Sequence, residues 1–186
     1  MGLLIIVFSL SEISYYKTVS ISFLCIGLLT DIFDGILARK LKVSSQKLRR
    51  LDSSIDQVFF LSFTLATFFQ SPDFFITHAT SLILLFFVEG LAYLICFIKF
   101  KREIATHTIG AKIWTLILFM TFIDLILNGN SNTLYYICFG FGVITRIEII
   151  AVLLILKKWT TDIPTFYHAI KLRQGKKIKR NSLLNG

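Results

Sequence analysis

Two pairs of aspartates stand in or beside long apolar runs of the sequence. Asp31 and Asp34, three residues apart, close one run. Asp52 and Asp56, four residues apart, open the next. These spacings place both members of a pair on one face of a helix, and a carboxylate in a membrane segment is by default a functional-site hypothesis. About a dozen residues join the runs, so we expect two antiparallel neighbouring helices whose four carboxylates meet at one end.

Four converging carboxylates repel one another and need compensating positive charge. Oxygen ligands without His or Cys favour Mg²⁺ or Mn²⁺, and bridging carboxylates can hold two ions. Two such ions suit chemistry at a phosphate, where they neutralise developing charge and orient the attacking and leaving oxygens. The alternative is that the aspartates only cap helices or pair with Arg39, Arg49 and Arg50. The presence of all four at this spacing favours the metal site.

The composition favours a membrane protein over a water-soluble one. Of the 186 residues, 55% are hydrophobic and 17% are charged, and the charged residues are clustered between apolar runs. A formal net charge of +9 could indicate nucleic-acid binding. The basic residues, however, lie in short tracts at the ends of the runs, which suits anionic membrane lipids as partners and argues against nucleic acid.

Each run of about 20 apolar residues predicts a helix, because backbone groups inside a bilayer must be satisfied within the segment. A shorter run, residues 2–10, predicts a truncated first helix. We therefore predict an all-α polytopic membrane helical bundle of about six transmembrane helices, forming a domain over residues 1–170 and followed by a basic cytoplasmic tail over residues 171–186. The five long runs are residues 19–38, 51–69, 79–98, 113–127 and 133–156.

The basic residues also predict the orientation, since cytoplasmic loops carry the excess of Lys and Arg. Residues 39–50, residues 99–112 and the chain from Lys157 onward together hold 18 of the 20 Lys and Arg residues. The intervening loops, 70–78 and 128–132, hold none. Both termini and the aspartates are therefore expected on the cytoplasmic side, at the inner membrane if the cell is bacterial.

The aspartates belong to a longer pattern that resembles the signature of the CDP-alcohol phosphatidyltransferase family, D-x2-D-G-x2-A-R-x8-G-x3-D-x3-D. Seven of its eight fixed positions match, and Leu48 stands at the second glycine. A match this close arises by chance with a probability on the order of one in a million. The matching residues are Asp31, Asp34, Gly35, Ala38, Arg39, Asp52 and Asp56.

The resemblance implies transfer of a phosphatidyl group from CDP-diacylglycerol or a similar CDP-linked lipid to an alcohol, with release of CMP, in phospholipid biosynthesis. It implies that Asp31, Asp34, Asp52 and Asp56 hold two Mg²⁺ or Mn²⁺ ions, and that Asp56 is the general base for the acceptor hydroxyl. Gly35 and Ala38 would let the cytidine nucleotide approach the helix, with Arg39 near its phosphates. Leu48 would border the nucleotide, where its side chain could crowd the cytidine.

The acceptor is addressed by a weaker similarity. Ala111 to Thr115 resembles a G-K-x2-T stretch of the glycerophosphate-using branch, the phosphatidylglycerophosphate synthase-like members. Together, Arg102, His107, Lys112 and Thr115 would form a basic rim for an acceptor phosphate such as that of glycerol 3-phosphate. Ordinary positive loop charge explains the same residues equally well. Inositol phosphate and serine stay open as acceptors, and a homodimer as the assembly.

Three further charged residues, Glu89, Arg146 and Glu148, lie deep in apolar runs. They predict a buried ion pair that fixes helix packing rather than a substrate site. Two other readings of the whole chain stay open. Aspartate-rich prenyl transferases also use metal-bound carboxylates, but their motifs lie far apart in the chain. A degenerate, non-catalytic membrane protein of the same fold is the other alternative, and Leu48 is the residue that favours it.

Overall fold

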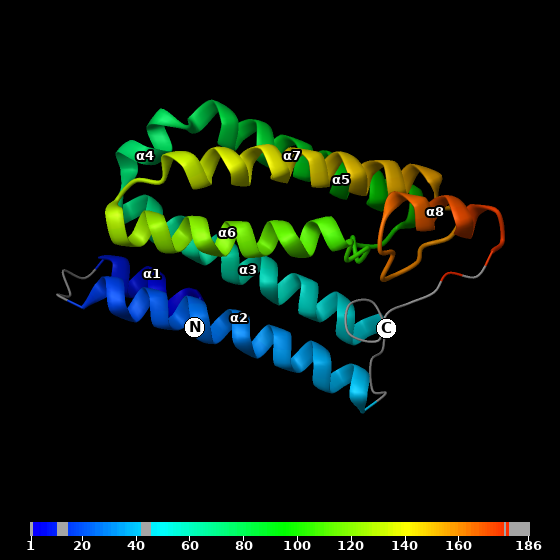
Figure 1. Ribbon diagram of the computed structural model, residues 1–186, viewed down its shortest axis with the longest axis horizontal. Coiled ribbons are helices and arrows are strands. Elements are labelled where there is room, and N and C mark those ends of the chain that lie inside the picture. The colour runs from blue at the N-terminus through cyan, green and yellow to red at the C-terminus, as the bar shows by residue number, and fades with distance from the viewer. Residues whose placement is uncertain (1, 11–14, 42–45, 177, 179–186) are drawn as a thin grey trace. The chain divides into compact units, whose positions relative to one another are not determined.

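The computed structural model describes residues 2–10, 15–41, 46–176 and 178, and their only regular structure is α-helix (Figure 1). The all-α prediction is confirmed. The helices follow in the order α1 (Gly2–Leu10), α2 (Tyr16–Lys40), α3 (Gln46–Gln70), α4 (Pro72–Thr77), α5 (Ala79–Phe100), α6 (Ile109–Asn128), α7 (Asn132–Ile155) and α8 (Phe166–Arg173). The backbone alone is described for Leu3, Arg39, Gln46, Lys47, Arg49, Arg50, Asp52 and Ser53.

Every apolar run of the sequence coincides with a helix. Within the described residues, four helices are long and apolar enough to cross a membrane, namely Tyr16–Ala38 of α2 and all of α5, α6 and α7. They fit an integral, polytopic membrane protein. The run 51–69 also forms a helix, α3, but α3 is not among the four because its first third is polar. The number of crossings, about six, stays a prediction.

Several helix ends differ from those that the apolar runs predict. Helix α6 begins at Ile109 rather than at residue 113, because the Thr108 hydroxyl accepts a hydrogen bond from the Ala111 amide at 3.2 Å and caps the first turn. Helix α3 begins five residues early, in a stretch of good helix formers. The predicted outer loop 70–78 contains α4, which starts at Pro72.

The described chain forms two compact units, the first comprising Met1–Ala79 and Ile117–Tyr136. In it, α1 lies against both α2 and α3 (Figure 1). Lys17, one of the two basic residues outside the basic tracts, donates a hydrogen bond to the Leu127 carbonyl oxygen at 2.7 Å and so satisfies the end of α6. The buried core consists of Ile5, Tyr16, Leu24, Phe63, Ala66, Phe122 and Ile126.

The second unit comprises Thr80–Leu116 and Ile137–Gly186. Ala92 and Cys96 of α5 pack against Ile149 and Leu153 of α7. Helix α8 is held at the end of α7, where its Ala169 is fully buried. Helix α8 spans residue 170, and the boundary predicted there between a membrane domain and a basic tail stays a prediction.

Candidate active site

A close contact between Gly27 and Phe59 joins α2 to α3 near the aspartates. An ideal Cβ atom built on Gly27 would lie only 2.3 Å from Phe59 Cζ and 2.6 Å from its Cε2. With the ring in this position there is no room for a side chain at Gly27, so Gly27 is a point of close approach between α2 and the Phe59 ring. The ring is held in turn by Phe63, at 4.9 Å between ring centroids, and by Phe60, at 5.5 Å. The contact therefore aligns Gly27 of α2 with the Phe59 ring of α3.

This alignment places the two aspartate pairs at matching heights. Helices α2 and α3 are joined by residues 41–45 and run antiparallel. Residues that follow Gly27 in α2 and residues that precede Phe59 in α3 therefore lie toward the same end of the helix pair. Asp31 lies four residues beyond Gly27, and Asp56 three residues before Phe59, which are rises of about 6 and 4.5 Å.

The outer pair of aspartates matches more closely still. Asp34 and Asp52 each lie seven residues from their contact residue, a rise of about 10.5 Å. Because seven residues are nearly two full turns, both positions share the face of the contact. The side chain of Asp52 lies outside the described residues.

The residues that the resemblance assigns to the nucleotide lie further along the same helix faces as the aspartates, and we call this row of positions on α2 and α3 the stripe. Ala38 lies eleven residues beyond Gly27 and Leu48 eleven before Phe59, which is close to three turns in each helix. Gly35 flanks the stripe and, like Ala38, is half-buried. Leu48 is 42% exposed. The remaining nucleotide candidate, Arg39, has no described side chain.

The donor set suits a hard divalent cation. All four candidate ligands are carboxylates, and the described ones are accessible, with Asp31 and Asp56 half-buried and Asp34 exposed. Carboxylate oxygens are the ligands that Mg²⁺ and Mn²⁺ prefer. No group of three metal-ligating side chains occurs among the described residues, a search that leaves out Asp52. The metal ligands therefore stay a prediction, which the register of the two helices supports.

The acceptor candidates belong to the second unit. Arg102 places its guanidinium over the Trp159 ring, 4.9 Å from the centroid, and the indole N–H donates to the Glu103 carbonyl oxygen at 2.9 Å. His107 adopts a left-handed backbone conformation, with φ of 45°. Lys112 lies in the first turn of α6. Thr115 donates its hydroxyl to the Ala111 carbonyl oxygen at 3.1 Å, so this proton is used within the helix.

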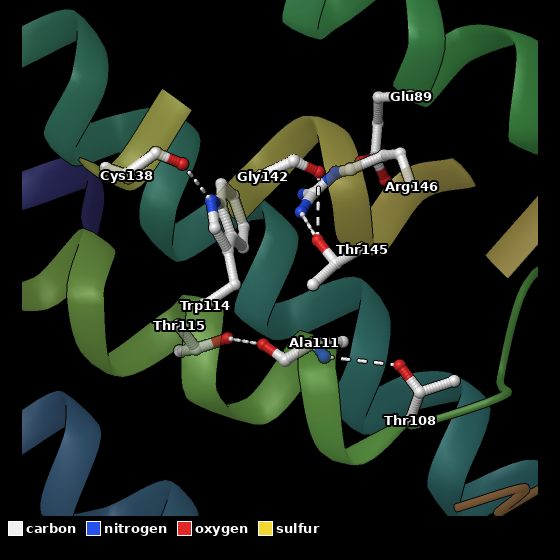
Figure 2. Close-up of polar contacts among 9 residues, drawn as sticks. All are labelled: Glu89, Thr108, Ala111, Trp114, Thr115, Cys138, Gly142, Thr145 and Arg146. Atoms are coloured by element: carbon white, nitrogen blue, oxygen red, sulfur yellow. Dashed lines mark hydrogen bonds and ion pairs between the residues drawn. The ribbon is translucent and has the colours of Figure 1, made fainter. Parts of the chain in front are cut away.

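A charged cluster links α5, α6 and α7 inside the second unit (Figure 2). The predicted ion pair is confirmed, because Arg146 Nε donates to Glu89 Oε2. Trp114 was not among the predicted site residues. Its ring centroid lies 3.5 Å from the Arg146 guanidinium carbon, and its indole N–H donates to the Cys138 carbonyl oxygen at 3.0 Å. A tryptophan in an apolar run gives no signal of such a partner.

Glu148 does not complete this ion pair. Its Oε1 accepts a hydrogen bond from the Phe166 amide at 3.2 Å, at the start of α8. That pairing joins residues 18 positions apart and depends on how the chain after α7 folds back, which no local pattern predicts.

Comparison with known proteins supplies one match. A profile of the family described as CDP-alcohol phosphatidyltransferase matches residues 1–158. No curated protein and no solved structure matches the chain. The matched region includes the four aspartates, the Gly27 and Phe59 contact and the acceptor candidates.

Proposed function

The chain belongs to the CDP-alcohol phosphatidyltransferase family, and we propose that it transfers a phosphatidyl group from CDP-diacylglycerol to glycerol 3-phosphate. The family transfers substituted phosphate groups from CDP-alcohols to alcohol acceptors in phospholipid biosynthesis and generally requires a divalent metal ion. Membership of the family does not specify the donor lipid, the acceptor or the branch, and we propose CDP-diacylglycerol, glycerol 3-phosphate and the phosphatidylglycerophosphate synthase-like branch.

The observation that carries the proposal is the contact between Gly27 and Phe59. Counted along the two antiparallel helices from that contact, Asp31 and Asp56 stand at similar distances, as do Asp34 and Asp52, which supports the proposal. We infer that these four residues hold two Mg²⁺ or Mn²⁺ ions. When bound, such ions neutralise the charge that develops on the phosphates during transfer.

Asp56 is the proposed general base. In the reaction, the acceptor hydroxyl oxygen forms a bond to the lipid-bearing phosphorus while the bond from that phosphorus to the bridging oxygen breaks. CMP leaves with the bonding electrons, and the hydroxyl proton passes to the Asp56 carboxylate. Asp56 is half-buried at the innermost level of the stripe, where a carboxylate can reach a hydroxyl held against the helices.

The nucleotide is proposed to lie at the outer levels of the stripe. Gly35 and Ala38 present little or no side chain there, so that the cytidine and ribose can approach the α2 backbone. Arg39 would pair with the nucleotide phosphates. Leu48 stands level with Ala38 and would border the base. The basic residues of 39–50 favour a cytoplasmic position for this end of the helices.

For the acceptor we propose Arg102, His107, Lys112 and Thr115, which offer two cationic side chains, an imidazole and a hydroxyl that would have to leave the Ala111 carbonyl oxygen to donate to a phosphate. Glycerol 3-phosphate is favoured because a phosphate is the acceptor group that such a set binds best. Serine also carries an anionic group, its carboxylate, but that group has one negative charge and two oxygens, fewer than a phosphate monoester.

Release of CMP tests the function directly. Purified protein is incubated with CDP-diacylglycerol and Mg²⁺, with glycerol 3-phosphate, inositol phosphate, serine or no acceptor, and CMP is quantified. We expect acceptor-dependent release with glycerol 3-phosphate and its loss in Asp34→Asn. Asp73→Asn is the matched control, since Asp73 is an exposed carboxylate of α4 outside the motif, and it should keep wild-type activity.

Other outcomes would redirect the assignment. Release that does not depend on any acceptor indicates hydrolysis of the CDP-lipid instead of transfer. Absence of release with every acceptor, together with retained Mn²⁺ binding, indicates the degenerate, non-catalytic reading. Release with serine alone keeps the family chemistry and overturns the acceptor.

A further inference from the structure

Glu148 is a half-buried carboxylate of α7 that the proposed reaction does not use. It lies on α7 two residues beyond Arg146, and its Oε1 accepts the Phe166 amide hydrogen at 3.2 Å. Phe166 is the first residue of α8, whose preceding residue, Thr165, makes no side-chain cap. The Thr165 hydroxyl is instead paired with His168 Nδ1 at 2.9 Å. Glu148 therefore supplies the cap that α8 lacks, and an anionic cap also suits the positive end of a helix.

The other oxygen of the same carboxylate lies against the start of α6. An ideal Cβ atom on Gly110 would lie 2.9 Å from Glu148 Oε2 and 3.1 Å from Thr145 Cγ2. Gly110 is the second residue of α6 and carries no side chain to exclude the carboxylate. One side chain of α7 thus touches the first turns of both α6 and α8.

The segment that Glu148 anchors supports the loop of the acceptor candidates. Asp162 and Ile163 donate their amide hydrogens to the carbonyl oxygens of Ala105 and Thr106, at 3.3 and 2.8 Å. The Ile109 amide donates to the Pro164 oxygen at 2.9 Å. These backbone bonds fasten residues 105–109 to residues 162–164, which lead directly into α8.

The same loop continues into α6 through a short capped turn. The Thr108 hydroxyl accepts from the Ala111 amide and the Thr115 hydroxyl is bonded to Ala111, as Figure 2 shows. Lys112 follows Ala111 directly. The backbone that carries His107, Lys112 and Thr115 is therefore held by segment 162–166 and by the Glu148 carboxylate, a set of contacts that we call the clasp.

We propose that Glu148 is a positioning residue for the acceptor, acting by holding the start of α8 and the start of α6 in one fixed arrangement. The inference rests on the proposed acceptor role of His107 and Lys112. The physical basis of the proposal is preorganisation. A bound phosphate needs its hydrogen-bond donors in place to within a fraction of an ångström, and a loop held at several points keeps them there before binding, so no conformational entropy is lost when the phosphate binds.

A double-mutant cycle, with the melting temperature as its readout, tests the clasp without any activity measurement. Gly110→Ala is made in the wild type and in Glu148→Ala, and the melting temperature of the purified full chain is compared. In the wild type, the added methyl group meets Glu148 and Thr145, and we expect a decrease of about 2 to 4 °C. In Glu148→Ala the principal obstacle is gone, and Ala in a helix is favoured over Gly, so the same change should leave the melting temperature level or raise it.

The control is Gly90→Ala on α5, where nothing lies within 4 Å of an added Cβ, and which should behave alike in both backgrounds. Glu148→Asp gives the same cycle with a carboxylate drawn back by one methylene, should Glu148→Ala fail to fold. Equal effects of Gly110→Ala in the wild type and in the folded Glu148 variant would show that the carboxylate does not constrain α6, and would overturn the proposal.

Steady-state CMP release tests the consequence. We expect Glu148→Ala to raise the KM for glycerol 3-phosphate about tenfold, the effect of one lost hydrogen bond, with kcat and the KM for CDP-diacylglycerol within about threefold of wild type. Glu148→Gln should restore the acceptor KM to within about threefold, because its amide oxygen still accepts from Phe166.

An equal rise in both KM values, or a Glu148→Gln variant as impaired as Glu148→Ala, would overturn the positioning role. If the wild type releases no CMP with any acceptor, the proposed function fails, and the double-mutant cycle still decides whether the clasp exists.

Discussion

Gly27→Ala is expected to impair the site through the helix contact, with no change to any aspartate. The new Cβ would lie 2.3 Å from Phe59 Cζ, whereas carbon atoms in contact settle at about 3.5 to 4.0 Å. The ring must therefore withdraw by about 1.2 to 1.7 Å. Phe60 and Phe63 stand beside it, so part of the displacement passes to the α3 backbone and to Asp56, one turn away.

The expected loss of activity exceeds the loss of stability. Overpacking costs about 1 to 3 kcal/mol, and Ala in place of Gly in a helix returns about 1 kcal/mol, which leaves about 0 to 2 kcal/mol of destabilisation. A displacement near 1 Å at a reacting group lowers rates by about a hundredfold. We therefore expect CMP release to fall by a factor of about 10 to 100 in a protein that remains folded.

The assay pairs CMP release with thermal unfolding for four variants. Phe59→Leu removes the three ring carbons that the new Cβ would meet, so Gly27→Ala combined with Phe59→Leu should recover activity that Gly27→Ala loses. Gly140→Ala on α7 is the control, because nothing lies within 4 Å of its added Cβ. If Gly27→Ala keeps more than half of wild-type CMP release, the contact between Gly27 and Phe59 does not position the aspartates of α2 relative to those of α3.

Three further predictions concern Asp56, Leu48 and the Arg146 ion pair. Asp56→Asn should lower CMP release by a factor of about 10² to 10⁴ while CDP-lipid affinity, measured by titration, stays within about threefold; retention of half the activity would exclude Asp56 as the base. Leu48→Gly should tighten CDP-lipid binding by removing bulk at a cost of about 1 kcal/mol in helix stability, and weaker binding would mean that the pocket is shaped around Leu48. Arg146→Ala should destabilise the protein by about 3 to 5 kcal/mol in thermal unfolding, because it leaves the Glu89 carboxylate unpaired, whereas replacing both Arg146 and Glu89 by Leu should recover most of that loss.

The helices could be predicted from the sequence because their signal is local. Runs of apolar residues are costly to leave in water or to unfold in a bilayer, and each run therefore forms a helix wherever its neighbours lie. Helix starts were harder to predict. The beginning of α6 depends on a single hydroxyl, that of Thr108, and α4 and α8 are too short and too polar to produce an apolar run.

The aspartate motif could be predicted from spacing, whereas the contact that places it could not. Gly27 and Phe59 are ordinary members of apolar runs, and neither residue signals locally that the other is its partner. The same holds for Glu148, whose bond to Phe166 depends on how the segment after α7 folds back. Spacing along one helix identifies residues that share a face, but only packing decides what that face meets.

The two aspartate pairs of the proposed site lie in helices of different composition. Its apolar part, Val58 to Phe69, has 12 residues and a length of about 18 Å, well short of the roughly 30 Å of a bilayer core. Asp52 and Asp56 precede that part among polar neighbours, so they lie outside the apolar stretch of α3. Helix α2 instead carries Asp31 and Asp34 on an apolar span, where a carboxylate without a cation is costly. The two pairs thus stand in different surroundings, and the proposed metal ions would chiefly compensate the charge of the pair on α2.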